Sequence, residues 1–180
     1  MIKKYSLFYS YKTLGDMLII SIIDAPITSV DTRNMVQLCY NKDTLVTIRV
    51  KGISKIMKIH TTGLIPLPGD TFVDVINSIL SKEMAPNLSY KNRSDYTIGE
   101  VMKSGVFIGD KIVDVCTDEL DVGIKVVIAN PNTRLATGLW CKDYHLCTYK
   151  DLHIGDSEEI LIIDEDCKIG EDFFEIGEEK

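Results

Sequence analysis

The sequence predicts an α+β N-terminal domain over residues 1–86, followed by a small all-β barrel over residues 94–180. In the first half, apolar residues alternate as in β-strands and then repeat once at helical spacing. The second half contains about five short strand-like runs separated by Gly- and Asp-bearing turns. Between the halves, residues 82–95 are polar and lack apolar periodicity, which is typical of a linker.

Strand-like runs in the first half lie at residues 17–23, 35–40 and 44–50. In the third run, polar and apolar residues alternate up to Val50, the pattern of a half-buried strand. A short polar connection, Asn-Lys-Asp, separates the last two runs. Residues 35–50 are therefore expected to form a hairpin.

One amphipathic helix is expected after this hairpin. Thr71 and Asp74 have the spacing of a capping box, in which side chains satisfy backbone N–H groups at a helix N-terminus. The apolar residues that follow have the i, i+3, i+4, i+7 and i+8 spacing of one helix face. They are Phe72, Val75, Ile76, Ile79 and Leu80. We expect this helix to cover the strands.

The strands expected in the second half are short. They lie at residues 96–102, 111–117, 124–130, 139–143 and 158–164. Their number and length are typical of a small barrel.

Charge is distributed unevenly along the chain. Residues 1–95 contain 12 Lys and Arg against 8 Asp and Glu (net +4), and residues 96–180 contain 8 against 19 (net −11), which together make the net −7 of the chain. An acidic half repels the phosphate backbone of nucleic acids unless its few cations are clustered.

Several features indicate a cytoplasmic protein without a membrane segment. The apolar run at residues 17–23 is interrupted by Ser21 and is too short to cross a bilayer. The N-terminal residues lack the pattern of a signal peptide. The five cysteines are odd in number and none belongs to a CxxC pair, so reduced thiols are expected.

The motifs do not support catalysis. P-loop, GxGxxG, HExxH and GxSxG motifs are absent from the sequence, and its acidic residues are scattered. Cys141, His145, Cys147 and His153 carry zinc-ligand side chains, but their spacing, C-x3-H-x-C-x5-H, matches no standard zinc pattern. Cysteines in apolar runs behave as small hydrophobes. We therefore expect neither an enzyme nor a bound metal or cofactor.

Two further features have competing interpretations. Trp140 is compatible with stacking on a base, as in single-strand binders, although a lone Trp beside Leu139 is more often part of a core. The only dense basic stretch of the sequence is more often a solvated face than a binding site. It contains Arg49, Lys51, Lys55 and Lys58.

Both halves resemble the bacterial YtpR-type proteins, in which an uncharacterised N-terminal domain precedes a tRNA-binding domain. In the first half the resemblance lies in FYSYKTLGDMLIISI and GLIPLPGDTFVDVINSIL. In the second half it lies in YTIGEV, GDKIVDVC, GIKVVIA, TGLWCKD, LCTYKDL and ILIIDEDCKIGEDF. The family's second domain is an OB-fold barrel, also found in one subunit of phenylalanyl-tRNA synthetase and in the C-terminal part of methionyl-tRNA synthetase. The resemblance implies an OB-fold-like second domain.

The same resemblance identifies two shortened segments. Asn-Pro-Asn at residues 130–132 invites a match to the Ala-Pro-Asn that ends one strand of the family, but the segment from residue 123 onward fits the family's following strand without a gap. In that alignment the Ala-Pro-Asn strand is missing between residues 116 and 123. The family's Arg-Gly-Val loop and Ser-x-Gly-Met turn are missing between residues 143 and 146. Residues 130–132 are then expected to be an ordinary turn.

The resemblance implies a non-catalytic tRNA-binding protein, accessory to aminoacylation or translation, whose protein partner is an aminoacyl-tRNA synthetase or another translation component. A homodimer also fits it. Because the family uses both missing segments to hold RNA, binding would depend on the remaining cations and aromatic residues of the barrel. These are Lys111, Lys125, Arg134, Trp140, Lys142, Tyr149 and Lys150. The alternative is a degenerate OB-fold that acts as a protein–protein interaction module and no longer binds RNA.

Overall fold

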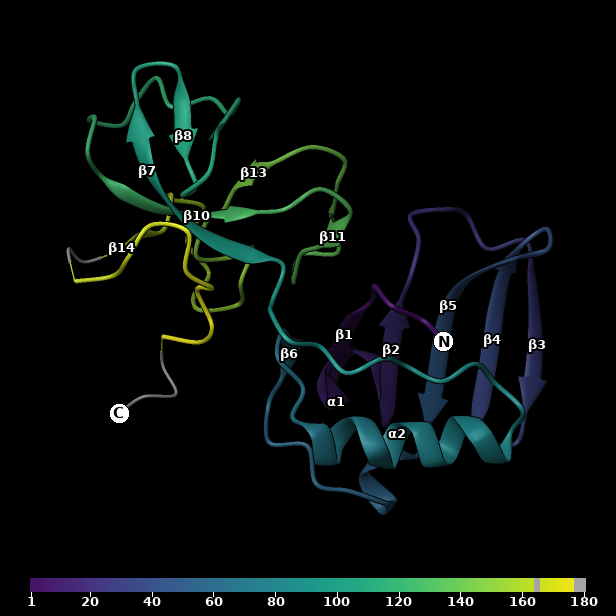
Figure 1. The fold of residues 1–180 in the computed structure, drawn as a ribbon. Helices are drawn as coiled ribbons and strands as arrows, with labels where there is room; N and C mark the ends of the chain where they lie inside the picture. The colour runs from purple at the N-terminus through teal and green to yellow at the C-terminus, as the bar shows by residue number, and fades with distance from the viewer. Residues whose placement is uncertain (164–165, 177–180) are drawn as a thin grey trace. The chain divides into compact units, whose positions relative to one another are not determined.

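In the computed structural model, which describes residues 1–163 and 166–176, the chain is mostly β (Figure 1). It divides into two compact units, Met1–Asn92 and Arg93–Lys180. In the described part of the chain, α2 (Asp70–Lys82) is the only helix of more than one turn, since α1 (Tyr11–Leu14) has four residues. None of the described helices is long and apolar enough to span a membrane. The expected α+β character of the first half thus rests on one helix, and the whole chain is better classed as antiparallel β.

The N-terminal unit is built on a six-stranded antiparallel sheet in the order β3-β4-β5-β2-β1-β6. Its strands are β1 (Ser6–Tyr9), β2 (Met17–Ser21), β3 (Ser29–Arg33), β4 (Val36–Asn41), β5 (Thr44–Lys51) and β6 (Gly63–Ile65). β2, β4 and β5 correspond to the expected strands, and the pairing of β4 with β5 confirms the expected hairpin. The sequence does not predict the other three strands, because β3 is exposed and polar and the other two have four residues or fewer.

The expected alternation along β5 is confirmed. Val46, Ile48 and Val50 are buried, and the residues between them are half-buried on the opposite face of the sheet. The basic stretch at residues 49–58 begins on this outer face and continues through a 3₁₀ turn, η1 (Ile53–Lys55). Its basic side chains therefore lie outside the core of the unit.

Helix α2 runs across the N-terminal sheet and contributes to its core (Figure 1). Ile76, Ile79 and Leu80 are buried as expected, together with Val73. The expected capping box is wrong, because the helix begins at Asp70 and its N-cap is Gly69, without a side-chain cap. The Gly69 carbonyl accepts hydrogen bonds from the first backbone N–H groups instead. An acidic residue in the first turn also suits the positive end of the helix dipole.

The polar segment after α2 is packed against the N-terminal unit for most of its length. Leu88 is buried, and its backbone N–H and C=O both bond to the Asn77 side-chain amide, at 2.7 and 2.9 Å. The Tyr5 hydroxyl donates to the Ser89 carbonyl at 2.6 Å. Asn92 and Arg93 are exposed, and Ser94 is buried again in the second unit. These contacts fix the C-terminal end of the first unit.

The second unit is built on an antiparallel sheet in the order β13-β10-β7-β8-β9, with β14 also paired to β10 and a separate β11–β12 hairpin. Its strands are β7 (Tyr96–Met102), β8 (Gly105–Phe107), β9 (Ile112–Val113), β10 (Lys125–Ala129), β11 (Thr133–Arg134), β12 (Trp140–Cys141), β13 (His145–Leu146) and β14 (Ile162–Ile163). The expected strands correspond to β7, β9, β10, β12 and β14, although three of these are only two residues long. Four consecutive residues of β10 are buried, so this strand lies at the centre of the core.

The expected closed barrel is not found among the described residues. The ladder ends at β9 on one side and at β13 and β14 on the other, and no pairing joins these edges. The physical reason is the shortness of these edge strands, which leaves few backbone groups to close a ladder. The start of β7 is instead covered by residues 170–173, and the Ile98 N–H donates to the Glu171 carbonyl at 2.9 Å.

Candidate nucleic-acid interface

The β11–β12 hairpin brings together two of the seven expected RNA-contacting residues. Its register pairs Arg134 with Trp140 and Thr133 with Cys141. Paired residues of antiparallel strands project from the same face, with Cβ atoms about 5 Å apart. Thr133 and Cys141 are buried, whereas Arg134 and Trp140 are half-buried. Trp140 is therefore not in the core, which was the more common alternative for a lone tryptophan.

Local sequence explains why this hairpin forms. Pro131 and Asn132 make the turn out of β10, and Asn132 has a φ of 62°, a left-handed conformation that asparagine tolerates. Its N–H donates to the Cys141 carbonyl at 2.6 Å. Gly138 takes the second left-handed position, with a φ of 89°, in the loop between the strands. The expected ordinary turn at residues 130–132 is confirmed.

Lys142 extends the same surface. It follows β12 directly and is exposed. The loop between β11 and β12 is tied to the turn at Asp151: the Ala136 N–H donates to the Asp151 carbonyl at 2.8 Å. Arg134, Trp140 and Lys142 thus form a compact group, which we call the hairpin surface.

Lys111, Lys125 and Lys150 lie outside the hairpin surface, and each interacts with a group of the protein. The Lys125 ammonium donates to the Cys167 carbonyl at 2.6 Å, and the Lys150 ammonium lies 2.8 Å from a carboxylate oxygen of Glu158. The hydrogen bond and charge of Glu158 raise the pKa of Lys150. Lys111 lies 5.1 Å from the centre of the Tyr144 ring, and a hydrogen bond to the Tyr144 side chain raises its pKa. A phosphate group would have to compete with these interactions.

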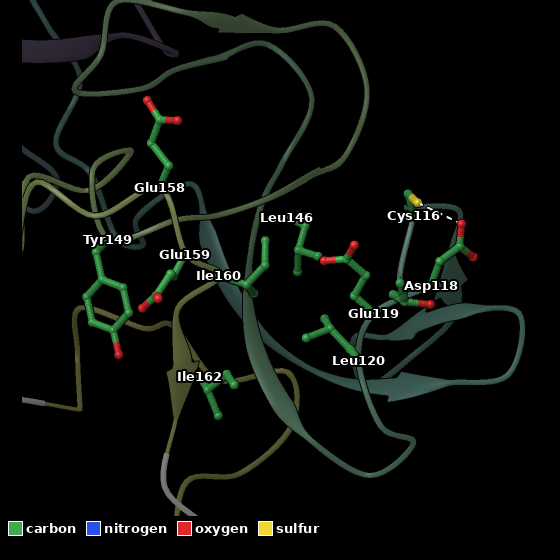
Figure 2. A pocket seen from close by; sticks show the side chains of 11 residues that line it. Cys116, Asp118, Glu119, Leu120, Leu146, Tyr149, Glu158, Glu159, Ile160 and Ile162 are labelled. Atoms are coloured by element: carbon green, nitrogen blue, oxygen red, sulfur yellow. Dashed lines mark hydrogen bonds between the residues drawn. The ribbon is translucent and has the colours of Figure 1, made fainter.

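Tyr149 lies in acidic surroundings. It lines a groove together with Glu158 and Glu159 (Figure 2). Carboxylates beside an aromatic ring repel the phosphates that flank a stacked base. The expectation that Tyr149 contacts RNA therefore gains no support from its neighbours.

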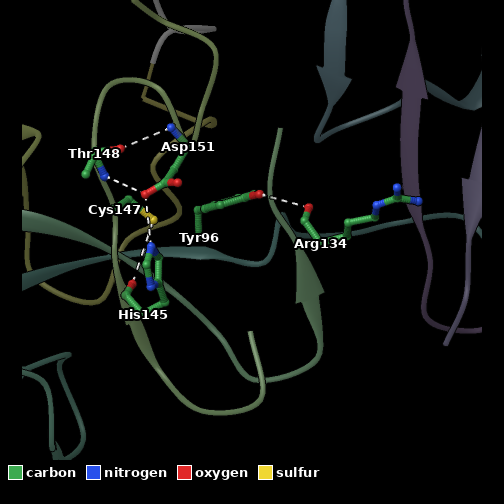
Figure 3. A network of polar contacts seen from close by, with 6 residues as sticks. All are labelled: Tyr96, Arg134, His145, Cys147, Thr148 and Asp151. Atoms are coloured by element: carbon green, nitrogen blue, oxygen red, sulfur yellow. Dashed lines mark hydrogen bonds and ion pairs between the residues drawn. The ribbon is translucent and has the colours of Figure 1, made fainter. Parts of the chain in front are cut away.

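A polar network lies next to the hairpin surface (Figure 3). Asp151 is buried and accepts hydrogen bonds from the His145 ring at 2.9 Å and from the Thr148 N–H at 2.9 Å. Burial alone would raise the pKa of Asp151, but these hydrogen bonds outweigh burial and lower it. The Tyr96 hydroxyl reaches the Arg134 carbonyl at 3.5 Å, which connects the core to β11. The hydrogen bonds of Asp151 thus hold the loop of residues 145–151, and the separate Tyr96 contact holds the base of the hairpin.

Asp151 is the residue of this network that sequence reasoning missed. The signal that could have identified it is the spacing Thr148-x-x-Asp151, in which each side chain caps the other's backbone N–H. This reciprocal pattern is usually sought at helix starts, and here it closes a turn between strands.

The cysteines beside this network are poorly suited to nucleophilic chemistry. Burial, reinforced by the charge of Asp151, raises the pKa of Cys147 far above its ordinary value and that of Cys141 to about 11. Both thiols are therefore protonated and weakly nucleophilic at neutral pH. Within residues 1–163 and 166–176, no three His, Cys, Asp or Glu side chains come close enough together to hold a metal ion. His153 lies on an exposed turn, apart from the buried cysteines.

Comparisons with known proteins do not place the chain in a family. No model of a known protein family matches the sequence. A search among curated proteins also returned no significant match.

Proposed function

We propose that this chain is a non-catalytic RNA-binding protein of the tRNA-binding kind, and that the hairpin surface is where it binds RNA. The observation that carries the proposal is the β11–β12 register, which sets Arg134 beside Trp140 on one face of the hairpin. Lys142, exposed at the end of the same hairpin, adds a second positive charge. The likeness of the sequence motifs to YtpR-type proteins supports the same function.

The chemistry of this group suits folded or single-stranded RNA. An indole ring stacks on any base, and a guanidinium pairs with phosphate through two parallel hydrogen bonds. Backbone contacts of this kind position an RNA without reading its sequence. Because residues 96–180 carry a net charge of −11, we expect affinity no better than roughly micromolar at physiological salt, as for non-specific binders.

The proposed role in the cytoplasm is that of a carrier. The raised pKa values of Cys141 and Cys147 remove the two nearest thiols as nucleophiles. Any effect on aminoacylation would then come from delivering tRNA to a synthetase or another translation component, and the protein itself would turn over no substrate.

The test is a salt titration of tRNA binding to the double variant Arg134→Glu with Lys142→Glu. We expect weaker binding to tRNA. The slope of log K against log salt should also fall by about 0.7 to 0.9 for each phosphate that the variant no longer neutralises. Fluorescence anisotropy of labelled tRNA measures both quantities.

A matched control is the double variant Lys3→Glu with Lys12→Glu, which changes the charge by the same amount at exposed cations of the N-terminal unit. We expect the control to keep most of the binding. Equal weakening in both variants would mean that net charge alone matters, and the hairpin surface would then not be the site. Unchanged binding in the hairpin variant would direct attention to the basic stretch at residues 49–58.

The second candidate function is a protein–protein interaction module without RNA binding. The observation in its favour is the pairing of Lys125 and Lys150 within the protein, which leaves few cations for phosphate in a unit of strongly negative charge. Absence of tRNA binding to the parent protein, even at low salt, would support this candidate instead.

A further inference from the structure

A groove in the second unit has a chemistry opposite to that of an RNA-binding surface. It has a volume of about 860 Å³ and lies between the loop of residues 116–120 and the segment of residues 158–162. Its apolar floor consists of Leu120, Leu146, Ile160 and Ile162. Its rim carries the carboxylates of Asp118, Glu119, Glu158 and Glu159. Among the described residues that line it, none is basic.

The four carboxylates of the rim differ in whether they form ion pairs or hydrogen bonds within the protein. Glu158 pairs with Lys150 at 2.8 Å, and Asp118 accepts a weak hydrogen bond from the Cys116 thiol at 3.3 Å. Glu119 and Glu159 have no basic partner in the part of the chain that the structure describes. Both side chains are exposed. Two negative charges are therefore available to a ligand on opposite sides of the groove.

The floor remains accessible to a ligand. Figure 2 shows Leu120, Leu146 and Ile160 gathered between the two acidic segments, with the Glu119 side chain among them. These three residues pack against the core of the unit but are only partly buried. Ile162 is 50% exposed, so its side chain is open to a ligand.

Two classes of ligand fit this groove poorly. A metal ion would need several converging carboxylates, and the described residues contain no group of three that could hold one. Nucleic acids and anionic membranes would be repelled by the rim, and residues 96–180 as a whole carry a net charge of −11. A cationic ligand with apolar surface is what remains.

We propose that this groove binds a lysine- or arginine-rich segment of another protein. Long basic side chains lay their methylene stems on apolar surface while the charged ends remain at the solvated edge. The floor would receive the stems, and the carboxylates of Glu119 and Glu159 would pair with the charged ends. The negative field of the unit would also speed the approach of such a segment. This inference does not depend on RNA binding at the hairpin surface.

The test uses the full chain and a labelled synthetic peptide of repeated Lys-Leu-Lys-Ala units, with a Lys-Ser-Lys-Ala peptide of equal charge as comparison. Fluorescence anisotropy gives the affinities. We expect the double variant Glu119→Lys with Glu159→Lys to bind the leucine peptide at least about tenfold more weakly, because like charges would then face each other. Ile162→Ser should weaken binding of the leucine peptide severalfold and leave the serine peptide unaffected.

The matched control is the double variant Asp110→Lys with Glu175→Lys, which makes the same change in charge at exposed residues outside the groove. It should bind the leucine peptide within about twofold of the parent protein. Equal weakening in both double variants, or equal affinity of the two peptides for the parent protein, would overturn the proposal.

Two further measurements test whether a second copy of the chain or an RNA binds in the groove instead of a basic segment. Sedimentation of the parent protein and of the Glu119→Lys, Glu159→Lys variant should give the same oligomeric state. A dimer that this variant disrupts would make a second copy of the chain the occupant and overturn the proposal. The variant should bind tRNA as well as the parent does, or better, whereas abolished tRNA binding would make the groove an RNA site and also overturn the proposal.

Discussion

At the scale of the residue, Asp151 determines how the loop beside the hairpin surface is held. Its carboxylate is buried and accepts hydrogen bonds from His145 and Thr148. Since these bonds lower its pKa in the folded state, its contribution to stability is present above the unfolded pKa of about 3.9 and is lost as pH falls through the folded pKa. We expect Asp151→Asn to cost roughly 1–3 kcal/mol in the free energy of unfolding at neutral pH. Urea unfolding at neutral pH and at roughly pH 3, below the unfolded pKa, measures both the cost and its pH dependence.

Asp156→Asn is the control for this prediction, because Asp156 is exposed in the adjacent loop. It should change the free energy of unfolding by less than about 0.5 kcal/mol. Equal destabilisation of the two variants would show that the buried carboxylate does not hold the loop. The same conclusion would follow if the free energy of unfolding of Asp151→Asn decreased on acidification as steeply as that of the parent protein.

At the scale of the element, β7 depends on the absence of a side chain at Gly99. A Cβ at this position would lie 2.3 Å from the Val106 side chain and 3.2 Å from the Phe107 carbonyl oxygen. Gly99→Ala should therefore force β8 away from β7 and destabilise the second unit by roughly 1–3 kcal/mol. Thermal or urea unfolding measures this destabilisation.

Two variants make the β7 prediction specific. Gly155→Ala should be tolerated, because its Cβ would meet nothing closer than 3.7 Å. Adding Val106→Ala to Gly99→Ala removes the closest clash and should restore part of the stability. Equal stability of the Gly99→Ala and Gly155→Ala variants would show that β7 and β8 are not packed as described.

At the scale of the whole molecule, the exposed residues between the two units are the expected site of proteolysis. Asn92 and Arg93 are exposed, while Leu88 and Ser94 on either side are buried. Cleavage concentrates where the backbone is exposed and has few contacts. Brief trypsin treatment should therefore cut first after Lys91 or Arg93 and release two fragments of about half the chain, identified by mass spectrometry.

The double variant Lys91→Gln with Arg93→Gln removes both tryptic sites, and it should survive intact for longer under the same conditions. First cuts inside both units, with this junction resistant, would contradict the division into two independently folded parts.

How much of the fold and of the candidate site can be predicted from the sequence depends on the periodicity of its apolar residues. Long, strongly periodic segments such as β5 and α2 are visible in it because burial of one face repeats at the spacing of the strand or helix. β11 and β13 have two residues each, which is too short for any period to appear. The sequence misplaces the start of α2 because Gly69 serves as the N-cap through its backbone, which leaves no side-chain signal.

The sequence by itself determined strands such as β5, β7 and β10, the single amphipathic helix, the acidic second half and the residue types of the proposed RNA site. These properties follow from local periodicity and composition. Only the tertiary structure decided that Arg134 lies beside Trp140, that Lys150 pairs with Glu158, and that the sheet of the second unit stays open in its described part. The physical reason is that strand register and ion pairing join residues distant along the chain, and no local pattern records which partners meet.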